Sequence, residues 1–458
     1  MRDATRVPTE IDEIEATLLE KINNGDESAA AVALYRKLNW RLLPILLIGF
    51  VFAYLDRVNV GFAKLQMQSE LHFSDAVYGV GAGIFFVGYV LFELPSNLLL
   101  PKIGARVTFS RIMALWGITS ACMMFVHSVP AFYAVRFLLG VFEAGFAPGV
   151  LFYLSRWYGP SRAARAISIV WLAGPISGIF GGPVAGWLLT GFASVGHLSG
   201  WQWMFLLEGA PCALLGIVAF FLLPNGPDTA KWLNDEERRL LASLLGPVKG
   251  LHGSFGAVLK DPKVYVLALA YLFIIAPIYA VSFWLPTILK LAGASNPVQV
   301  GWYAAIPSAA GALAIYFGGR SSDKRGERRF HIAVPVFIAF LALCAWVFTG
   351  GNLIAATLAF TAVTATTWMA NVVFWAVPTE YIKGDASAGA IALINTIGLS
   401  GGFWGPAIIG WAETATGNIH VGFLVMAAML FLSALLILSL ALAPKSAVVP
   451  VSVGETSV

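Results

Sequence analysis

The sequence predicts an all-α integral membrane protein whose twelve transmembrane helices form two pseudo-symmetric halves of six. The first observation behind this fold class is composition. Of 458 residues, 58% are apolar and 12% are charged, with a mean hydropathy of +0.78. Soluble domains carry about 25% charged residues, so this chain has too little polar surface for a water-soluble enzyme, a disordered chain or a small disulfide scaffold. The other two observations are the placement of basic residues and an internal repeat.

Continuous apolar runs, such as Trp116–Val126 and Phe431–Leu442, indicate helices rather than the alternating strands of a barrel. A helix satisfies its own backbone hydrogen bonds in lipid and needs about 20 residues to cross it. Proline, glycine and charged residues separate the runs. In order, we expect helices at residues 39–63, 75–101, 106–126, 130–155, 163–190, 201–224, 263–290, 297–320, 330–349, 352–376, 384–411 and 419–443.

Polar segments divide these helices into two halves, 39–224 and 263–444. The segment 1–38 is an expected cytoplasmic tail, 225–262 a cytoplasmic central loop, and 445–458 a second cytoplasmic tail. The first tail holds eight acidic residues and lacks the apolar core of a signal peptide. Helical spacing of Ile11, Ile14, Leu18 and Ile22 is compatible with a short amphipathic helix, although we favour a solvated tail.

The basic residues support this topology. With both termini in the cytoplasm, 25 of the 29 Lys and Arg residues fall on the cytoplasmic side, as the positive-inside rule requires. Lys64 and Lys290 fall in outer loops, while Arg57 and Arg136 lie inside expected helices. One missed or added helix would scramble this separation, so we expect a multi-pass protein of the cytoplasmic membrane.

The two halves also repeat a pattern. The stretch 97–106 after the second helix matches 319–328 after the eighth, and Gly182-Pro183 matches Gly405-Pro406. Repeated halves around a central site are typical of secondary transporters, and an enzyme does not need them.

Charged residues inside the helices are the candidates for function, because charges in a bilayer are rare and costly. They are Asp56, Arg57, Glu93, Arg136 and Glu143, with Glu208 near a helix end where water could reach it. Arg136 and Glu143 are seven residues apart and so share a helix face. Two arginines and two acids predict a proton-coupled anion site: an arginine fork binds a carboxylate, and a buried acid exchanges protons as its partner changes. The alternative is a static salt-bridge network.

Several uncharged side chains are candidates for lining the same site. Tyr54 lies within one turn of Arg57, and Tyr89 lies midway along its helix. Asn371 and Asn395 are amides in the tenth and eleventh helices and need a partner in hydrocarbon. The alternative for the tyrosines is packing against lipid or core, and for the amides a contact with a neighbouring helix.

A cytoplasmic gate is the expected role of the tight turn at 319–329. We expect Asp323 to cap a neighbouring helix or to pair across the halves, which would lock the inner side shut. Its neighbours Lys324, Gly326 and Arg328 belong to the same turn, although simple charge anchoring is the alternative for the basic ones. Glu93, at the inner end of the second helix, is expected to pair with a cytoplasmic arginine.

Metal and cofactor chemistry is not expected. The three cysteines lie inside apolar segments, the six histidines fall in loops or at helix ends, and none has metal-ligand spacing. We therefore expect no metal, no cofactor other than the proton as coupling ion, no nucleic-acid partner and no enzyme activity. The expected partners are membrane lipid and a small carboxylate, and the expected state is a monomer.

Several motifs resemble those of the major facilitator superfamily and its anion:cation symporter branch. Residues 319–329 resemble the loop motif of the superfamily, and the first copy departs from it because Pro101 stands where an acid is expected. Five stretches resemble the branch in order, namely 54–59, 93–97, 136–149, 200–209 and 230–233. The residues of these motifs are most similar to those of bacterial permeases for tartrate, phthalate and hydroxyphenylacetate, and this resemblance implies the inner membrane of a bacterium.

This resemblance implies a twelve-helix major facilitator fold that imports organic anions with protons by alternating access. It also implies that Asp56 and Glu143 bind protons, that Arg57 holds the substrate carboxylate and that Arg136 positions the two acids. Tyr54, Tyr89 and Asn395 match cavity positions. The glycine-proline run at 174–186 resembles an antiporter motif, so an anion exchanger or an exporter is the alternative. A transport-dead receptor is a further alternative, although 225–262 is short for a signalling domain.

Overall fold

The computed structural model describes residues 29–193, 195–245, 261–349, 352–381 and 387–440, and the fold there is helical throughout. Twelve helical segments are long and apolar enough to cross a membrane, which confirms the predicted number. The helices of the N-terminal half are α2 (Ala29–Leu71), α3 (Asp75–Ile103), α4 (Ala105–Cys122), α5 (Val129–Glu143), α6 (Phe146–Ser155), α7 (Pro160–Trp171), α8 (Ala173–Gly191) and α9 (Gly200–Leu222).

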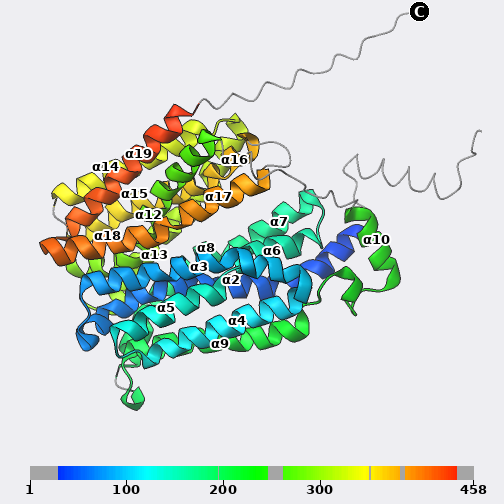
Figure 1. Cartoon of the computed structure of the whole chain (residues 1–458), viewed down its shortest axis with the longest axis horizontal. Coiled ribbons are helices and arrows are strands. Elements are labelled where there is room, and N and C mark those ends of the chain that lie inside the picture. The colour runs from blue at the N-terminus through cyan, green and yellow to red at the C-terminus, as the bar shows by residue number, and fades with distance from the viewer. Residues whose placement is uncertain (1–28, 194, 246–260, 350–351, 382–386, 441–458) are drawn as a thin grey trace, which may run out of the picture.

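The C-terminal half continues the same pattern (Figure 1). Several spans are interrupted: α5 and α6 form one span, as do α7 with α8, α15 with α16, and α17 with α18. At the first of these breaks Gly145 has φ +88°, a left-handed conformation that favours glycine. The helices are α12 (Pro262–Leu291), α13 (Pro297–Arg325), α14 (Arg329–Thr349), α15 (Leu353–Phe374), α16 (Ala376–Tyr381), α17 (Ser387–Leu399), α18 (Gly401–Thr416) and α19 (Ile419–Ser439).

The first helix is longer than the sequence analysis expected at both ends. It begins at Ala29 instead of 39, so ten residues assigned to the tail are helical, and it ends at Leu71 instead of 63. Lys64, assigned to an outer loop, therefore lies within α2 and is only 3% exposed. It is buried because Asp75 pairs with its Nζ at 2.7 Å and the Trp284 ring centroid lies 3.6 Å away. The segment 11–22, where we favour a solvated tail over an amphipathic helix, falls outside the described residues.

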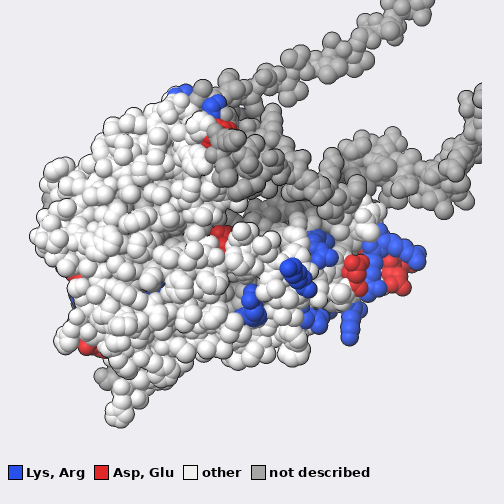
Figure 2. Space-filling view, viewed as in Figure 1, with Lys and Arg blue, Asp and Glu red and all other residues white. Residues whose placement is uncertain are grey.

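The central segment also differs from its prediction as a loop. Helix α10 (Asp235–Leu245) forms there, because Asn234 and Glu237 cap it reciprocally through side-chain contacts to backbone N–H groups of 2.7 and 2.9 Å. Lys37 of α2 binds Glu237 at 2.7 Å, which ties α10 to the N-terminal half. Lys and Arg side chains gather at this end of the molecule in Figure 2.

The two halves touch closely at the end opposite α10, which we call the closed end and define by contacts around Leu65, Tyr78, Trp284 and Thr414. Tyr78 Oη donates to the Phe283 carbonyl at 2.8 Å, and the Ala76 N–H donates to Thr414 Oγ1 at 2.8 Å. Glycines permit this approach: a Cβ on Gly410 would collide with the Asp75 carbonyl of α3. Backbones in close contact at glycines are typical of membrane helix packing.

Candidate functional site

Arg57 and Glu143 form an ion pair at the centre of the N-terminal half. Arg57 Nε donates to Glu143 Oε1 at 2.8 Å, and Nη2 contacts the same oxygen. The Glu143 side chain is completely buried, whereas that of Arg57 is 15% exposed. Glu143 is the last residue of α5, directly before the break at Gly145. Its second oxygen, Oε2, has no hydrogen-bond partner among the described residues.

Aromatic rings surround the Arg57 guanidinium. The ring centroids of Tyr54, Phe85 and Tyr89 lie 5.7, 5.6 and 5.3 Å from its Cζ, within the range of cation–π attraction. Nη1 donates to the hydroxyl of Tyr279 at 3.4 Å, and Tyr279 belongs to α12 in the other half. The structure thus brings Tyr54 and Tyr89 to Arg57 as expected from their positions. It adds Tyr279, which sequence reasoning missed, since a tyrosine in an apolar helix is usually a packing residue.

Asp56 points away from its neighbour Arg57. Adjacent residues on a helix do not share a face, so Asp56 reaches α4 while Arg57 reaches α5. Its carboxylate accepts hydrogen bonds from Trp116 Nε1, from Ser120 Oγ at 2.6 Å and from Asn59 Nδ2 at 3.4 Å. Asp56 is fully buried, and no described cation forms an ion pair with it.

Arg136 makes different contacts from those expected of a residue that positions both acids. Its Nε and Nη2 donate to the carbonyls of Gly81 and Ala82 in α3, at 3.2 and 3.1 Å. Its Cζ lies 5.4 Å from the Phe85 ring centroid. Arg136 therefore hydrogen-bonds to backbone, and the partner of Glu143 in this structure is Arg57. The sequence around Arg136 does not show which backbone carbonyls its side chain will meet in the fold.

Two further acids lie elsewhere than expected. Glu93 does not pair with a cytoplasmic arginine in the described part of the chain; its Oε1 accepts from Asn395 Nδ2 of α17 at 3.4 Å, across the two halves. Glu208, expected near water, is 5% exposed and accepts from Asn59 Nδ2 at 2.9 Å. The remaining candidate amide, Asn371, has a buried Oδ1 without a hydrogen-bond partner among the described residues.

A cavity of about 120 Å³ lies beside this cluster, between α2 and α8 of one half and α12, α13 and α15 of the other. Tyr54 connects the two features, because its ring lies on the cavity wall as well as 5.7 Å from Arg57 Cζ. The described lining is mostly apolar, with Trp368 and the hydroxyls of Ser282, Ser308 and Thr364, and holds no charged side chain. Tyr54 therefore joins the cavity to the Arg57 guanidinium.

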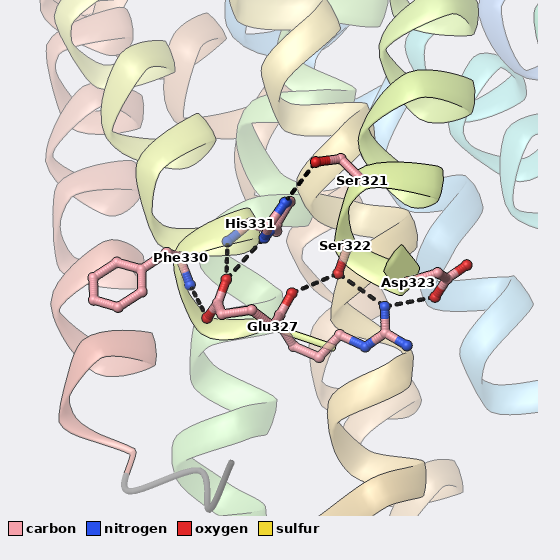
Figure 3. Close-up of polar contacts among 7 residues, drawn as sticks. Ser321, Ser322, Asp323, Glu327, Phe330 and His331 are labelled. Atoms are coloured by element: carbon pink, nitrogen blue, oxygen red, sulfur yellow. Dashed lines mark hydrogen bonds and ion pairs between the residues drawn. The ribbon is translucent and has the colours of Figure 1, made fainter. Parts of the chain in front are cut away.

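The turn between α13 and α14 closes on itself (Figure 3). Asp323 pairs with Arg328 at 2.7 Å, Arg328 also donates to Ser322 Oγ at 2.8 Å, and the Asp323 side chain is 73% exposed. The expected pairing of Asp323 across the halves is absent from the described contacts. Gly326 ends α13 with φ +62°, and Lys324 is an exposed residue of its last turn.

Glu327 of the same turn caps the helix that follows. Its carboxylate accepts from the backbone N–H groups of Phe330 and His331 at 2.7 and 3.2 Å and contacts His331 Nδ1 at 2.8 Å. Partial burial raises the pKa of Glu327, but these hydrogen bonds outweigh it and leave the pKa below its usual value. The polar side chains of this turn therefore bind to each other and to the first residues of α14.

Comparisons with known proteins identify the family of this chain. The Major Facilitator Superfamily model matches residues 46–406. A "Putative metabolite transport protein NicT" of Pseudomonas putida is 42% identical over 421 residues, 91% of this chain and 96% of that protein. A "Putative tartrate transporter" of Agrobacterium vitis is 42% identical over 90% of this chain and 92% of its own length. A "Quinolone resistance transporter" of Acinetobacter baumannii is 39% identical, covering 84% and 90%.

The fold itself has solved counterparts. A bacterial homolog of the human lysosomal transporter Spinster, crystallised in an inward-facing and occupied conformation, superposes with a TM-score of 0.71 at 17% identity. The match covers 87% of this chain and 95% of that one. Family, relatives and twelve spans together indicate a multi-pass inner-membrane protein. The chain therefore belongs to the major facilitator superfamily and is a transporter of organic substrates, not an enzyme.

Proposed function

We propose that this transporter takes up a small organic anion together with protons by alternating access. The observation that carries the proposal is the Arg57–Glu143 pair, in which a partly exposed cation is held by a fully buried acid. A planar guanidinium is suited to a carboxylate, which it binds with two parallel hydrogen bonds. In this structure Glu143 occupies the position at Arg57 for which a substrate carboxylate would compete.

The competition links the anion to a proton. When a substrate carboxylate takes Arg57, Glu143 loses its ion-pair partner while it stays buried. A buried carboxylate without a cation is costly, and binding a proton removes that cost. The proton therefore enters with the anion and leaves when Arg57 returns to Glu143. Asp56, which is buried on a different face of the same helix, is the second proposed proton site.

Alternating access requires that the two halves separate at one end and meet at the other. The contacts of the closed end join the halves there, and we place that end on the outer side of the membrane, with α10 and both termini in the cytoplasm. The solved transporter with an inward-facing conformation has the same overall fold. Opening of the closed end would then break the contacts of Tyr78 and Thr414 in one movement.

Uptake into proteoliposomes tests the proposal. Protein reconstituted with an acid-outside gradient is expected to accumulate labelled carboxylates, beginning with tartrate and aromatic acids, and a proton ionophore is expected to abolish accumulation. Equal uptake of every transported carboxylate with and without the gradient would contradict proton coupling. Failure to transport any carboxylate while neutral compounds are transported would contradict the anion site.

Export is the second candidate function, and a relative supports it: the similar protein of Acinetobacter baumannii is described as a quinolone resistance transporter. In that case protons moving inward would drive the substrate outward. The same vesicles distinguish the two, because an acid-outside gradient increases the internal substrate concentration in symport and depletes preloaded substrate in export. A norfloxacin-loaded vesicle is the appropriate probe for the second outcome.

A further inference from the structure

A buried acid on α9 has no part in the mechanism proposed above. Glu208 lies in the interior of the N-terminal half, 5% exposed, and Asn59 Nδ2 donates to its Oε2 at 2.9 Å. Carboxyls are almost never fully buried unless a partner compensates their charge. The described part of the chain supplies Glu208 with an amide donor but with no ion pair.

The same amide group contacts a second acid. Asn59 Nδ2 lies 3.4 Å from Asp56 Oδ1 and 2.9 Å from Glu208 Oε2, and Asn59 is itself 2% exposed. Its Oδ1 is buried and has no hydrogen-bond partner among the described residues. The amide nitrogen of Asn59 therefore contacts both carboxyls, while its oxygen Oδ1 has no hydrogen-bond partner among the described residues.

Among the described residues, no cation forms an ion pair with either of these two acids. Helix α9 packs against α2, α4, α8 and the short 3₁₀ helix Met123–Phe125, and the titratable side chain among them that lies beside Glu208 is Asp56. Two other charged residues make their contacts elsewhere. Glu143 accepts from Arg57, and Arg136 donates to the backbone of α3. Cys212, one turn along α9, is buried and uncharged at neutral pH. Two ionised carboxylates here would be buried beside each other without an ion pair of their own, a cost that proteins avoid by sharing a proton.

We propose that Glu208 and Asp56 form a proton-sharing pair bridged by Asn59, in which Glu208 holds the proton while Asp56 is ionised. The number of donors determines this division: three side chains donate to Asp56 and one to Glu208. A protonated carboxyl still accepts through its carbonyl oxygen, so the contact with Asn59 is preserved in the neutral acid. The proposal rests on the proposed proton coupling and adds Glu208 as a positioning residue that acts through Asp56.

Such a pair titrates as a unit, and the second proton leaves only at higher pH because the departing proton exposes two like charges. Replacing Glu208 by glutamine removes one of those charges. The alkaline limb of the pH dependence of uptake is then expected to move to lower pH by about one unit. Glu208→Asp keeps a carboxyl and is expected to restore most of the original profile. A merely structural role for Glu208 would change the amount of folded protein but not the profile.

Infrared difference spectroscopy provides a readout that does not need transport. Purified wild-type protein at neutral pH is expected to show the C=O stretching band of a protonated carboxyl that shifts in D2O. Glu208→Gln is expected to lose this band, and Glu208→Asp to keep it at an altered frequency. The control is Glu236→Gln, which removes an exposed acid of α10 and should leave band and pH profile unchanged.

The outcomes separate this inference from the proposed function. If wild-type uptake ignores the proton gradient, the proton coupling itself is wrong. If wild-type uptake follows the gradient while Glu208→Gln keeps both the wild-type pH profile and the infrared band, the sharing pair is wrong and the coupling stands. Should Glu208→Gln not fold, a wild-type spectrum that lacks any exchangeable carboxyl band would also overturn the proposal.

Discussion

At the scale of single residues, the two buried arginines differ in what holds them. Arg57 contacts a carboxylate and the rings of Tyr54 and Tyr89, and it is partly exposed. Arg136 is fully buried and donates to backbone carbonyls of α3. A carboxylate that can be displaced leaves Arg57 available to a ligand, whereas the carbonyls that hold Arg136 belong to a helix. This difference supports the proposal that Arg57 binds the ligand, while the contacts of Arg136 are those of a packing residue.

The first prediction concerns the shape of the cation at position 57. Arg57→Lys keeps the charge but loses the planar fork, so substrate affinity is expected to fall at least about tenfold, or roughly 1.4 kcal/mol. The change in affinity is measured on purified protein from the thermal shift at increasing concentrations of the carboxylate. Unchanged affinity in the lysine variant would contradict two-point binding by Arg57. Arg320→Lys, outside the site, is the matched control.

The second prediction concerns the acid that holds Arg57. Glu143→Gln cannot take up a proton, so it is expected to retain substrate counterflow and to lose accumulation driven by the gradient. Its substrate affinity should equal or exceed that of the wild type, because Arg57 no longer has a competing carboxylate. Vesicle counterflow and gradient-driven uptake are measured side by side. Retained accumulation would transfer the proton site to another residue, with Asp56 the first to examine.

At the scale of elements, an ion pair from α10 and an aromatic stack from the segment just before it hold this region against the N-terminal half. Lys37 binds Glu237, and Trp232 stacks on Trp157 with ring centroids 5.6 Å apart. The hydrogen bonds from Lys37 and from the Asn234 N–H lower the pKa of Glu237 below its usual value. A lowered pKa in the folded state means that this carboxylate stabilises docking above its ordinary range. That contribution is lost as the pH falls through the lowered value.

The third prediction follows from this sign. Limited proteolysis within 235–245 is expected to be slow at neutral pH and faster in acid. Lys37→Met should increase the rate at neutral pH several-fold and should remove most of its pH dependence. The rates are read by mass spectrometry of the released peptides. A Lys37→Met protein with the wild-type rate at every pH would show that the aromatic stack alone holds α10.

Much of the helical framework could be predicted from sequence, and the contacts of the site could not. Apolar runs and basic loops identify spans because lipid imposes both patterns on every span. Helix α10 was missed although Asn234 and Glu237 carry the spacing of a capping box, a signal that apolar periodicity does not detect. The partners of Arg136 and Glu93 depend on how helices approach one another. Backbone carbonyls and an amide 302 residues away leave no trace in local sequence.

At the scale of the whole molecule, glycine governs how closely the halves meet. On α18, Gly410 faces the Asp75 carbonyl and Gly79 of α3, and on α13, Gly301 faces Gly182 of α8. Side chains at these positions would separate the halves at the closed end. The equilibrium between closed and open forms of this end is therefore sensitive to volume at a few helix crossings.

The fourth prediction uses this sensitivity. Gly410→Val is expected to hold the closed end open, lengthening the distance between spin labels on cysteines placed at positions 72 and 418. The labels require a background without Cys122, Cys212 and Cys344. Gly319→Val is the matched control, because no atom lies within 4 Å of a Cβ built there. Identical label distances in wild type and Gly410→Val would show that the closed end does not separate at this crossing.

Asp56 and Arg57 are neighbours in sequence that contact different helices, and this has a mechanical consequence. The two residues share one peptide bond on a stiff helix, yet one is held by α4 and the other by α5 and α12. A twist of α2 about its axis that draws Arg57 away from Glu143 must also swing Asp56 relative to Trp116 and Ser120. Rotation of this rigid helix would therefore couple the contacts of Arg57 directly to those of Asp56, with no other residue between them.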